Sequence, residues 1–184
     1  MSPYGLPLST TPPHVQIFTL GRFDLVIDGN PVRFNGRAPM RSLELLGALI
    51  SAGGRGVSAG SLSDHLWPDA DGFDAYRAFT TTLHRLRRLL RYPEAVRLWG
   101  GQLTLDPQFC QVDVWAFERA LRAAYDRDST EAALSLYHGP FMAAFANAWA
   151  VETRERLRQL ILRAEQREHL RPYARAEISP ALAM

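Results

Sequence analysis

The chain contains no lysine, because all 21 of its basic residues are arginine. A P-loop phosphate site and a Schiff base with pyridoxal phosphate are therefore excluded, since each needs that primary amine. The single cysteine, Cys110, cannot form an internal disulfide, which is typical of proteins in a reducing cytoplasm. No window approaches ~18 uninterrupted apolar residues, so no membrane span is predicted. The expected location is the cytoplasm.

Motifs for catalysis and metal binding are also absent. Neither an HExxH motif nor paired metal-ligand spacing connects the five histidines, His14, His65, His84, His138 and His169. There is no GxSxG nucleophile elbow. Residues 54–59, GRGVSA, match GxGxxA but follow a predicted helix, whereas a dinucleotide site must follow a strand. The sequence therefore predicts neither an enzyme nor a metal or cofactor site.

Charge is distributed unevenly along the 184 residues, although the net charge is only +2. Between residues 72 and 102, six arginines face two acidic residues, a local excess of +4. Between residues 109 and 171, nine arginines balance nine acidic residues. A basic patch confined to one segment favours a binding face over a general role in solubility.

Residues 74–91, DAYRAFTTTLHRLRRLLR, are the most strongly patterned segment. At 100° per residue one arc holds Ala75, Tyr76, Phe79, Leu83, Leu86 and Leu90. The opposite arc holds Arg77, Thr80, Thr81, His84, Arg87, Arg88 and Arg91, with Arg85 on its flank. The pattern predicts an amphipathic helix of roughly 27 Å.

The polar face of this helix has few acidic residues to neutralise its arginines. A solvated helix face usually mixes charges of both signs. We therefore expect the negative charge to come from outside the chain, with nucleic acid as the leading candidate. Taken alone, the helix fits an ordinary solvated surface equally well.

Short strands are predicted near the N-terminus. Residues 15–20 and 22–28 are rich in Val, Ile and Phe, and apolar side chains alternate with polar ones in the second run. Asp28-Gly29-Asn30-Pro31 supplies turn residues before a third predicted strand over 32–34. A small antiparallel sheet is therefore expected to open the fold.

Two helices are predicted before the basic helix. The first starts near Pro39, which suits a first helical position, and stops at Gly53-Gly54. The second follows Ser58, a favourable N-cap, and ends at Trp67-Pro68. An acidic loop then leads into the basic helix, which is expected to end at Pro93.

A hairpin is predicted over residues 95–105, AVRLWGGQLTL, in which two alternating runs flank Gly100-Gly101. The order of a small sheet, three helices and a hairpin is that of a winged helix-turn-helix, so the fold class is α+β. The tip of this wing would carry Arg97, Trp99 and Gln102.

The second part of the chain is predicted to be all-helical. Asp113 can cap one helix, and Asp128 with Glu131 resembles the capping box of another. Residues 152–171 predict a charged helix that ends at Pro172.

Several of these segments together resemble a known family. The winged-helix part, with LWP at 66–68 and LHRLRR at 83–88, is similar to the OmpR/PhoB type, in the form found in the Streptomyces antibiotic regulatory protein (SARP) family. The resemblance continues through VDVWAFERAL (112–121), YHGPF (137–141) and ETRERL (152–157), which are similar to the start of the bacterial transcriptional activation domain of that family. It covers about residues 15–171.

The resemblance implies a tetratricopeptide-like arrangement of helix pairs after the winged helix. The activation domain is expected to be partial, because in the family it continues through further helix pairs. The resemblance also implies that the loop 69–73 contacts RNA polymerase and that two copies bind head-to-tail on direct repeats. The expected organisation is a disordered tail (1–13), a winged-helix DNA-binding domain (14–107), a linker (107–111), a partial activation domain (112–171) and a tail (172–184).

The function expected from these features is sequence-specific regulation of transcription, with activation implied by the resemblance. The basic helix would enter the major groove of double-stranded DNA, and the wing would reach the backbone or minor groove. Base contacts are expected from Arg77, Thr81, His84 and Arg88, since arginine pairs bidentately with guanine and threonine can touch the thymine methyl group. Phosphate contacts are expected from Arg85, Arg87, Arg91 and Arg97. Thr80, Trp99 and Gln102 complete the predicted interface.

An alternative is a protein-interaction module whose helical part binds and regulates a partner, with DNA binding secondary. The basic helix face argues against this alternative. The short helical part argues for it.

Overall fold

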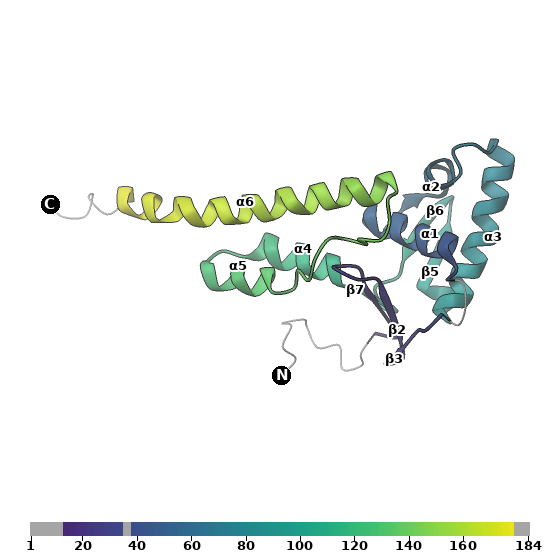
Figure 1. Ribbon diagram of the computed structural model, residues 1–184, viewed down its shortest axis with the longest axis horizontal. Coiled ribbons are helices and arrows are strands. Elements are labelled where there is room, and N and C mark those ends of the chain that lie inside the picture. The colour runs from purple at the N-terminus through teal and green to yellow at the C-terminus, as the bar shows by residue number, and fades with distance from the viewer. Residues whose placement is uncertain (1–12, 35–37, 179–184) are drawn as a thin grey trace. The chain divides into compact units, whose positions relative to one another are not determined.

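The structure, a computed structural model, describes residues 13–34 and 38–178 (Figure 1). These residues form two compact units. The first is built from the described residues of 1–17, 25–49 and 54–111, and the second from those of 18–24, 50–53 and 112–184. Each unit therefore combines segments that are distant in the sequence.

A four-stranded sheet contains the N-terminal strands, in the order β3-β2-β1-β7. The strands are β1 (Val15–Phe18), β2 (Asp24–Ile27), β3 (Asn30–Pro31) and β7 (Cys110–Val112). Along β1 and β2, buried residues alternate with more exposed ones, as expected for a sheet with one face on a core. The sequence predicts this opening sheet, but not all of its strands.

The third strand lies earlier than predicted. Strand pairing occurs at Asn30–Pro31, with Val26 opposite Pro31 and Ile27 opposite Asn30, and not over residues 32–34. Asp28 and Gly29 form a two-residue turn with φ values of 50° and 77°, and this short turn brings the next two residues into register.

The segment predicted as a linker, residues 107–111, overlaps strand β7. The carbonyl of Phe109 accepts a 2.9 Å hydrogen bond from the amide of Val15, which places the segment along the N-terminal strand. Three residues form this strand, so its hydrophobic alternation is too short to be recognised locally.

Three helices follow the N-terminal strands: α1 (Met40–Ser51), α2 (Ala59–Leu66) and α3 (Gly72–Leu90). Helix α1 starts after Pro39, as predicted, and the Pro39 carbonyl accepts hydrogen bonds from the amides of Ser42 and Leu43. Ser58 caps α2, also as predicted, because its hydroxyl accepts from the amide of Ser61 at 3.2 Å. Fully buried core residues of these helices include Leu45, Leu46, Leu49, Phe79 and Leu86.

The predicted wing is present after α3 and a short 3₁₀ helix, η1 (Pro93–Ala95). Strand β5 (Val96–Trp99) pairs antiparallel with β6 (Gln102–Leu105). Gly100 and Gly101 form the turn with φ values of 54° and 74°, which glycine adopts without steric cost. A short strand, β4 (Val57–Ser58), pairs with β6, giving the order β4-β6-β5.

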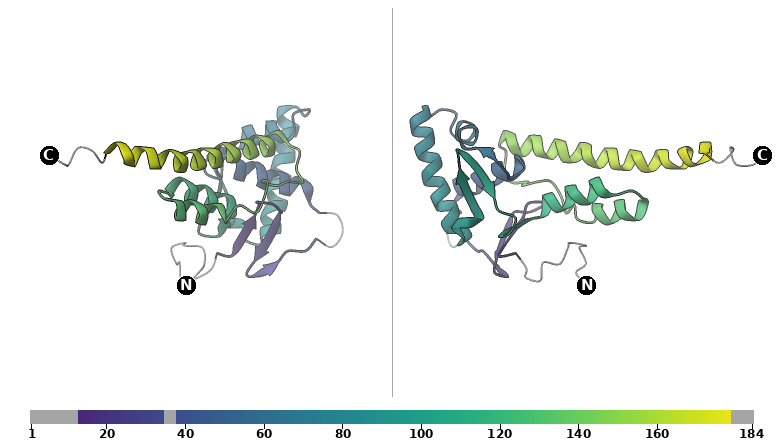
Figure 2. Two further views of the ribbon diagram at one scale, coloured as in Figure 1. Left: turned by 60° about the vertical axis from the view of Figure 1, so that its left-hand side comes forward. Right: turned by 180° about the vertical axis from the view of Figure 1, so that it is seen from behind.

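The second unit contains three helices, α4 (Asp113–Ala123), α5 (Arg127–Leu134) and α6 (Ala148–Ile178) (Figure 2). Helix α4 contacts both α5 and α6. The buried carboxylate of Glu118 on α4 binds Arg122 one turn later at 2.8 Å and also forms an ion pair with Arg156 of α6. This all-helical arrangement agrees with the sequence prediction.

Asp113 does more than begin α4. Its carboxylate accepts hydrogen bonds from the amides of Thr19 and Leu20, at 2.8 to 3.0 Å, and from the Thr19 hydroxyl at 2.6 Å. It also accepts from the amide of Val114 at 2.7 Å. One side chain therefore holds the segment 18–24 against the start of α4.

The predicted capping box of Asp128 and Glu131 is wrong. The N-cap of α5 is Asp126, whose side chain accepts from the amide of Ser129, while the Ser129 hydroxyl accepts from the amide of Asp126. Asp126 and Ser129 have the three-residue spacing of a capping box, whereas Asp128 already lies within the first helical turn.

Helix α6 starts earlier than predicted, at Ala148. It also ends later, because it continues through Pro172 to Ile178. Proline removes one backbone donor from a helix interior and disturbs it there, but the hydrogen bonds on either side can continue. The remaining parts of the two predicted tails, residues 1–12 and 179–184, lie outside the described residues. Among the helices described, none is long and apolar enough to span a membrane.

Candidate nucleic-acid interface

Helix α3 starts and ends at well-defined caps. Asp71 is its N-cap and accepts a 2.9 Å hydrogen bond from the amide of Asp74, so two acidic residues lie at the positive end of the helix dipole. The C-cap is Arg91, in the left-handed region with φ of 62°, and its amide donates to the Arg88 carbonyl. The helix therefore ends at Leu90, before the predicted end at Pro93.

The buried face of α3 consists of Ala75, Phe79, Thr82, Leu83, Leu86 and Leu90. The predicted apolar arc is correct except for Tyr76, which is 49% exposed. Tyr76 lies at the edge of that arc, and its ring packs against Phe79 with a centroid distance of 5.9 Å. Burial of this single face fixes which side chains of the helix point away from the core.

The exposed face of α3 contains the predicted site residues Arg77, Thr80, Thr81, His84, Arg85 and Arg88, and the exposed Arg91 follows the helix as its C-cap. Arg87 differs from them, because it is half-buried and its Nε donates a 2.8 Å hydrogen bond to the carbonyl of Val96 in the wing. The hydroxyl of the exposed Thr80 donates to the carbonyl of Tyr76 at 2.9 Å.

The outward face of the wing carries the other predicted residues. Arg97 lies opposite Thr104, and Trp99 lies opposite Gln102, so these side chains share one side of the hairpin. Arg97 and Gln102 are exposed, and Trp99 is 86% exposed beside the turn. Tryptophan side chains are usually far more buried in folded proteins, so the exposed Trp99 is available for an external contact.

Two of the predicted site arginines have carboxylate partners, whereas the sequence predicts that these cations are unpaired. Arg97 lies 3.1 Å from the largely buried carboxylate of Asp106, and Arg77 lies 3.9 Å from Asp74. Within the residues that the structure describes, no carboxylate lies within 4.0 Å of Arg85, Arg87, Arg88 or Arg91. The sequence could not reveal the Asp106 pair, because strand register alone brings the two residues together.

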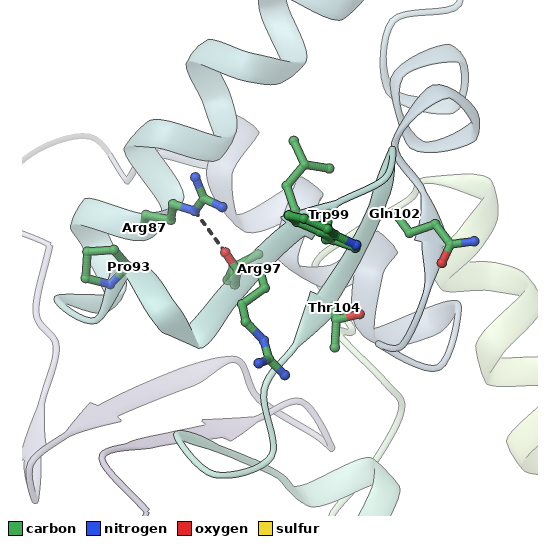
Figure 3. Close-up of a pocket in the computed structure, with 8 residues that line it drawn as sticks. Arg87, Pro93, Arg97, Trp99, Gln102 and Thr104 are labelled. Carbon is green, nitrogen blue, oxygen red and sulfur yellow. Dashed lines mark hydrogen bonds between the residues drawn. The ribbon is translucent and has the colours of Figure 1, made fainter.

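A hollow of about 510 Å³ lies between α3 and the wing (Figure 3). Its lining consists of Arg87, Pro93, Val96, Arg97, Leu98, Trp99, Gln102 and Thr104. Two guanidinium groups, an amide and a hydroxyl are thereby grouped beside an exposed indole. Such donors suit the oxygens of a sugar-phosphate chain.

A cluster that sequence reasoning missed joins the end of α3 to the N-terminal sheet. The Asp28 carboxylate accepts hydrogen bonds from Nδ1 of His14 at 2.9 Å and from the Tyr92 hydroxyl at 2.8 Å. These two bonds lower the pKa of Asp28, and the bond to Asp28 raises the pKa of Tyr92. No local signal identifies this cluster, because Asp28 and Tyr92 are 64 residues apart in the sequence.

The titratable groups offer little that resembles a metal or catalytic centre. Across the side chains that the structure describes, residues 13–34 and 38–167, no group of three or more His, Cys, Asp or Glu could hold a metal ion. Cys110 is buried, and burial together with the nearby charge of Asp106 raises the pKa of its thiol to about 12.

Helix α3, the preceding helix α2 and the β5–β6 hairpin together define a winged-helix fold, followed here by a helical unit. This is the fold that the SARP resemblance predicts. No family model matches the chain. The chain is 33% identical over 155 residues to an uncharacterized 47.3 kDa protein from the 5′ region of thcA in Rhodococcus erythropolis. The match covers 83% of this chain and 31% of that protein.

The structure of Mycobacterium tuberculosis EmbR in complex with a low-affinity phosphopeptide is also similar. The TM-score is 0.59 and the sequence identity is 19%, over 83% of this chain and 44% of EmbR. At this identity the similarity concerns the fold, and it supports a winged helix followed by helices. The chain spans less than half the length of either protein.

Proposed function

We propose that this protein is a sequence-specific, double-stranded DNA-binding regulator of transcription. The observation that carries the proposal is the exposed face of α3, where Arg77, His84, Arg85 and Arg88 point away from the core of the unit, followed by the exposed C-cap Arg91. In a winged helix the corresponding helix enters the major groove, and the width of the groove admits one α-helix.

The proposed interface divides by position into contacts with base edges and contacts with the phosphate backbone. Arg77, Thr81, His84 and Arg88 would meet base edges, with Thr80 beside them. Arg85, Arg87, Arg91 and Arg97 would hold phosphates, and Trp99 with Gln102 would contact the backbone or minor groove next to the wing. The hollow beneath the wing would receive the sugar-phosphate chain between these two sets.

The hydrogen bond of Arg87 to Val96 gives this residue a double role. Its Nε is used within the protein, so only the remaining N–H groups are available to a phosphate. Arg97 similarly shares its charge with Asp106. We therefore place the strongest phosphate contacts at Arg85 and Arg91.

Further parts of the proposal follow from the SARP resemblance. Two copies would bind head-to-tail on direct repeats in the cytoplasm. The loop predicted over 69–73 is shorter than expected, because α3 starts at Gly72, and its remaining residues 69–71 would contact RNA polymerase to activate transcription. The helical unit would be part of an activation domain.

Gel shifts with the full chain test the proposal. Duplexes from a random pool are selected for binding, and the selected and scrambled duplexes are then compared at two salt concentrations. Preference for the selected duplex supports sequence-specific recognition. Equal and weak binding to both would favour the protein-interaction alternative.

A further inference from the structure

Two aromatic side chains interrupt the polar surface at the start of α3. Phe73 is 74% exposed, and Tyr76 is 49% exposed. Because α3 starts at Gly72, Phe73 belongs to its first turn. At 100° per residue it lies within about 40° of Arg77 and about 20° of Thr80, on the face turned away from the core.

The neighbours of Phe73 extend this apolar surface. The guanidinium carbon of Arg77 lies 5.9 Å from the centre of the Phe73 ring, so the cation and the ring share one part of the helix face. Thr80 is exposed on the same face, and its hydroxyl already donates to the Tyr76 carbonyl at 2.9 Å. We call Phe73, Tyr76 and Thr80 the aromatic patch.

We infer that the aromatic patch recognises the 5-methyl group of a thymine in the major groove, with Phe73 as a specificity-determining residue. The inference rests on the proposed function. Residues at the N-terminal end of a recognition helix are those that reach base edges. Thymine is the one base that presents a methyl group there. The ring of phenylalanine and the methyl group of threonine are suitable apolar partners for it.

Charge identifies DNA as the occupant of this surface. The aromatic patch lies on the same face of α3 as Arg77, His84 and Arg88, all exposed. Arg77 lies 3.9 Å from Asp74, whereas Arg88 has no carboxylate within 4.0 Å among the described residues. A ligand that covers the patch while lying along this face must therefore combine negative charge with an apolar group. Duplex DNA has both, in its phosphates and its thymine methyl groups.

Replacing thymine by uracil tests the inference, because uracil lacks only the methyl group. The full chain is first used to select its preferred duplex. Each thymine of that duplex is then replaced in turn, and affinity is measured by fluorescence anisotropy for the wild type and Phe73→Ala. Tyr125→Ala is the matched control, since Tyr125 is 73% exposed but belongs to the second unit.

The expected result is a loss of roughly fourfold in wild-type affinity at one or two thymines, the effect of one methyl-sized apolar contact. Phe73→Ala should lose nothing further at those positions, and Tyr125→Ala should behave like the wild type. Thermal unfolding should be the same for all three proteins, because both aromatic side chains are exposed.

Three results would overturn the inference while leaving the proposed function intact. They are selected duplexes without thymine, a wild type that tolerates every uracil, and a Phe73→Ala variant that remains as sensitive to uracil as the wild type. In the last case Phe73 would serve a protein partner instead. Failure to bind any duplex would refute the proposed function itself, and the inference with it.

Discussion

The side chain of Arg87 is bonded to the backbone of Val96, with 2.8 Å between Nε and the carbonyl oxygen. This hydrogen bond joins the exposed helix α3 directly to the first strand of the wing. The distance between these two elements of the proposed interface is therefore set by the protein before any ligand binds. Such preorganisation reduces the entropy that binding must offset.

Removing this bond should weaken the fold as well as DNA binding. Arg87→Ala is expected to lower the free energy of unfolding by about 1 kcal/mol, the net value of one partly buried hydrogen bond. Arg88→Ala, at the adjacent exposed position, should change stability by less than about 0.5 kcal/mol. Urea unfolding followed by circular dichroism measures both. Equal stability of the two variants would show that the bond does not hold the wing.

Arg77 and Arg91 should differ in the kind of contact they make. Arg77→Ala is expected to cost about 1–3 kcal/mol on the selected duplex and much less on a scrambled one. Arg91→Ala should weaken both duplexes by a similar, smaller factor and reduce the salt slope by about one. Fluorescence anisotropy gives all four affinities. Equal losses on both duplexes for Arg77→Ala would make it a phosphate contact and contradict its assignment.

Side chains at the two glycines of the wing turn should destabilise the protein. Gly100 and Gly101 have positive φ and nothing within 4 Å of an added Cβ, so only the backbone conformation opposes alanine. Each substitution should destabilise the protein by about 1 kcal/mol. Gly60→Ala is the control, because Gly60 lies in α2 with ordinary φ, and alanine should stabilise it by about 0.5–1 kcal/mol. Thermal melts that show no difference between turn and helix variants would contradict this account.

The Asp28 cluster should make stability depend on pH. The pKa of Asp28 is lower in the folded protein than in the unfolded chain, chiefly because His14 and Tyr92 bond to the carboxylate. Its contribution is therefore present above the ordinary carboxylate pKa of about 4 and is lost as pH falls through the lower folded value. The pKa of Tyr92 is raised, so its contribution is lost as pH rises above about 10.

Urea unfolding of the wild type and Asp28→Asn at several pH values measures this effect. The wild type should be the more stable protein near pH 7, and the difference should shrink toward pH 3. An advantage that is independent of pH across this range would argue against the assigned ionisation.

Local features of this fold could be predicted from the sequence because the residues that cause them are adjacent. The Gly100-Gly101 turn, the Ser58 cap and the buried face of α3 each depend on a few neighbouring side chains. Of the candidate site, the sequence identifies most of the exposed side chains of α3, since a helix repeats its faces at a fixed angle, with Tyr76 and Arg87 at the edges of the two faces as the exceptions.

Long-range contacts could not be predicted in the same way. Asp113 binds Thr19, and Tyr92 binds Asp28, across 94 and 64 residues of sequence. Pairing of Arg97 with Asp106 also depends on how β5 and β6 align. The first turn of α3 differs, because its start signal is local: Asp71 is a favoured N-cap residue and Asp74 lies in the first turn, although Gly72 between them is a poor helix former. The sequence prediction starts the helix at Asp74 instead. Phe73 was therefore absent from the predicted interface.

Salt dependence of DNA binding tests the central claim most directly. The four arginines assigned to phosphates would release about four counterions, so affinity should fall by about 100-fold or more between roughly 50 and 200 mM salt. Anisotropy titrations of the full chain with its selected duplex measure this change. The account predicts that steep loss, with a shallower slope for Arg91→Ala. Affinity that stays flat across this range, or no binding at all, would contradict it.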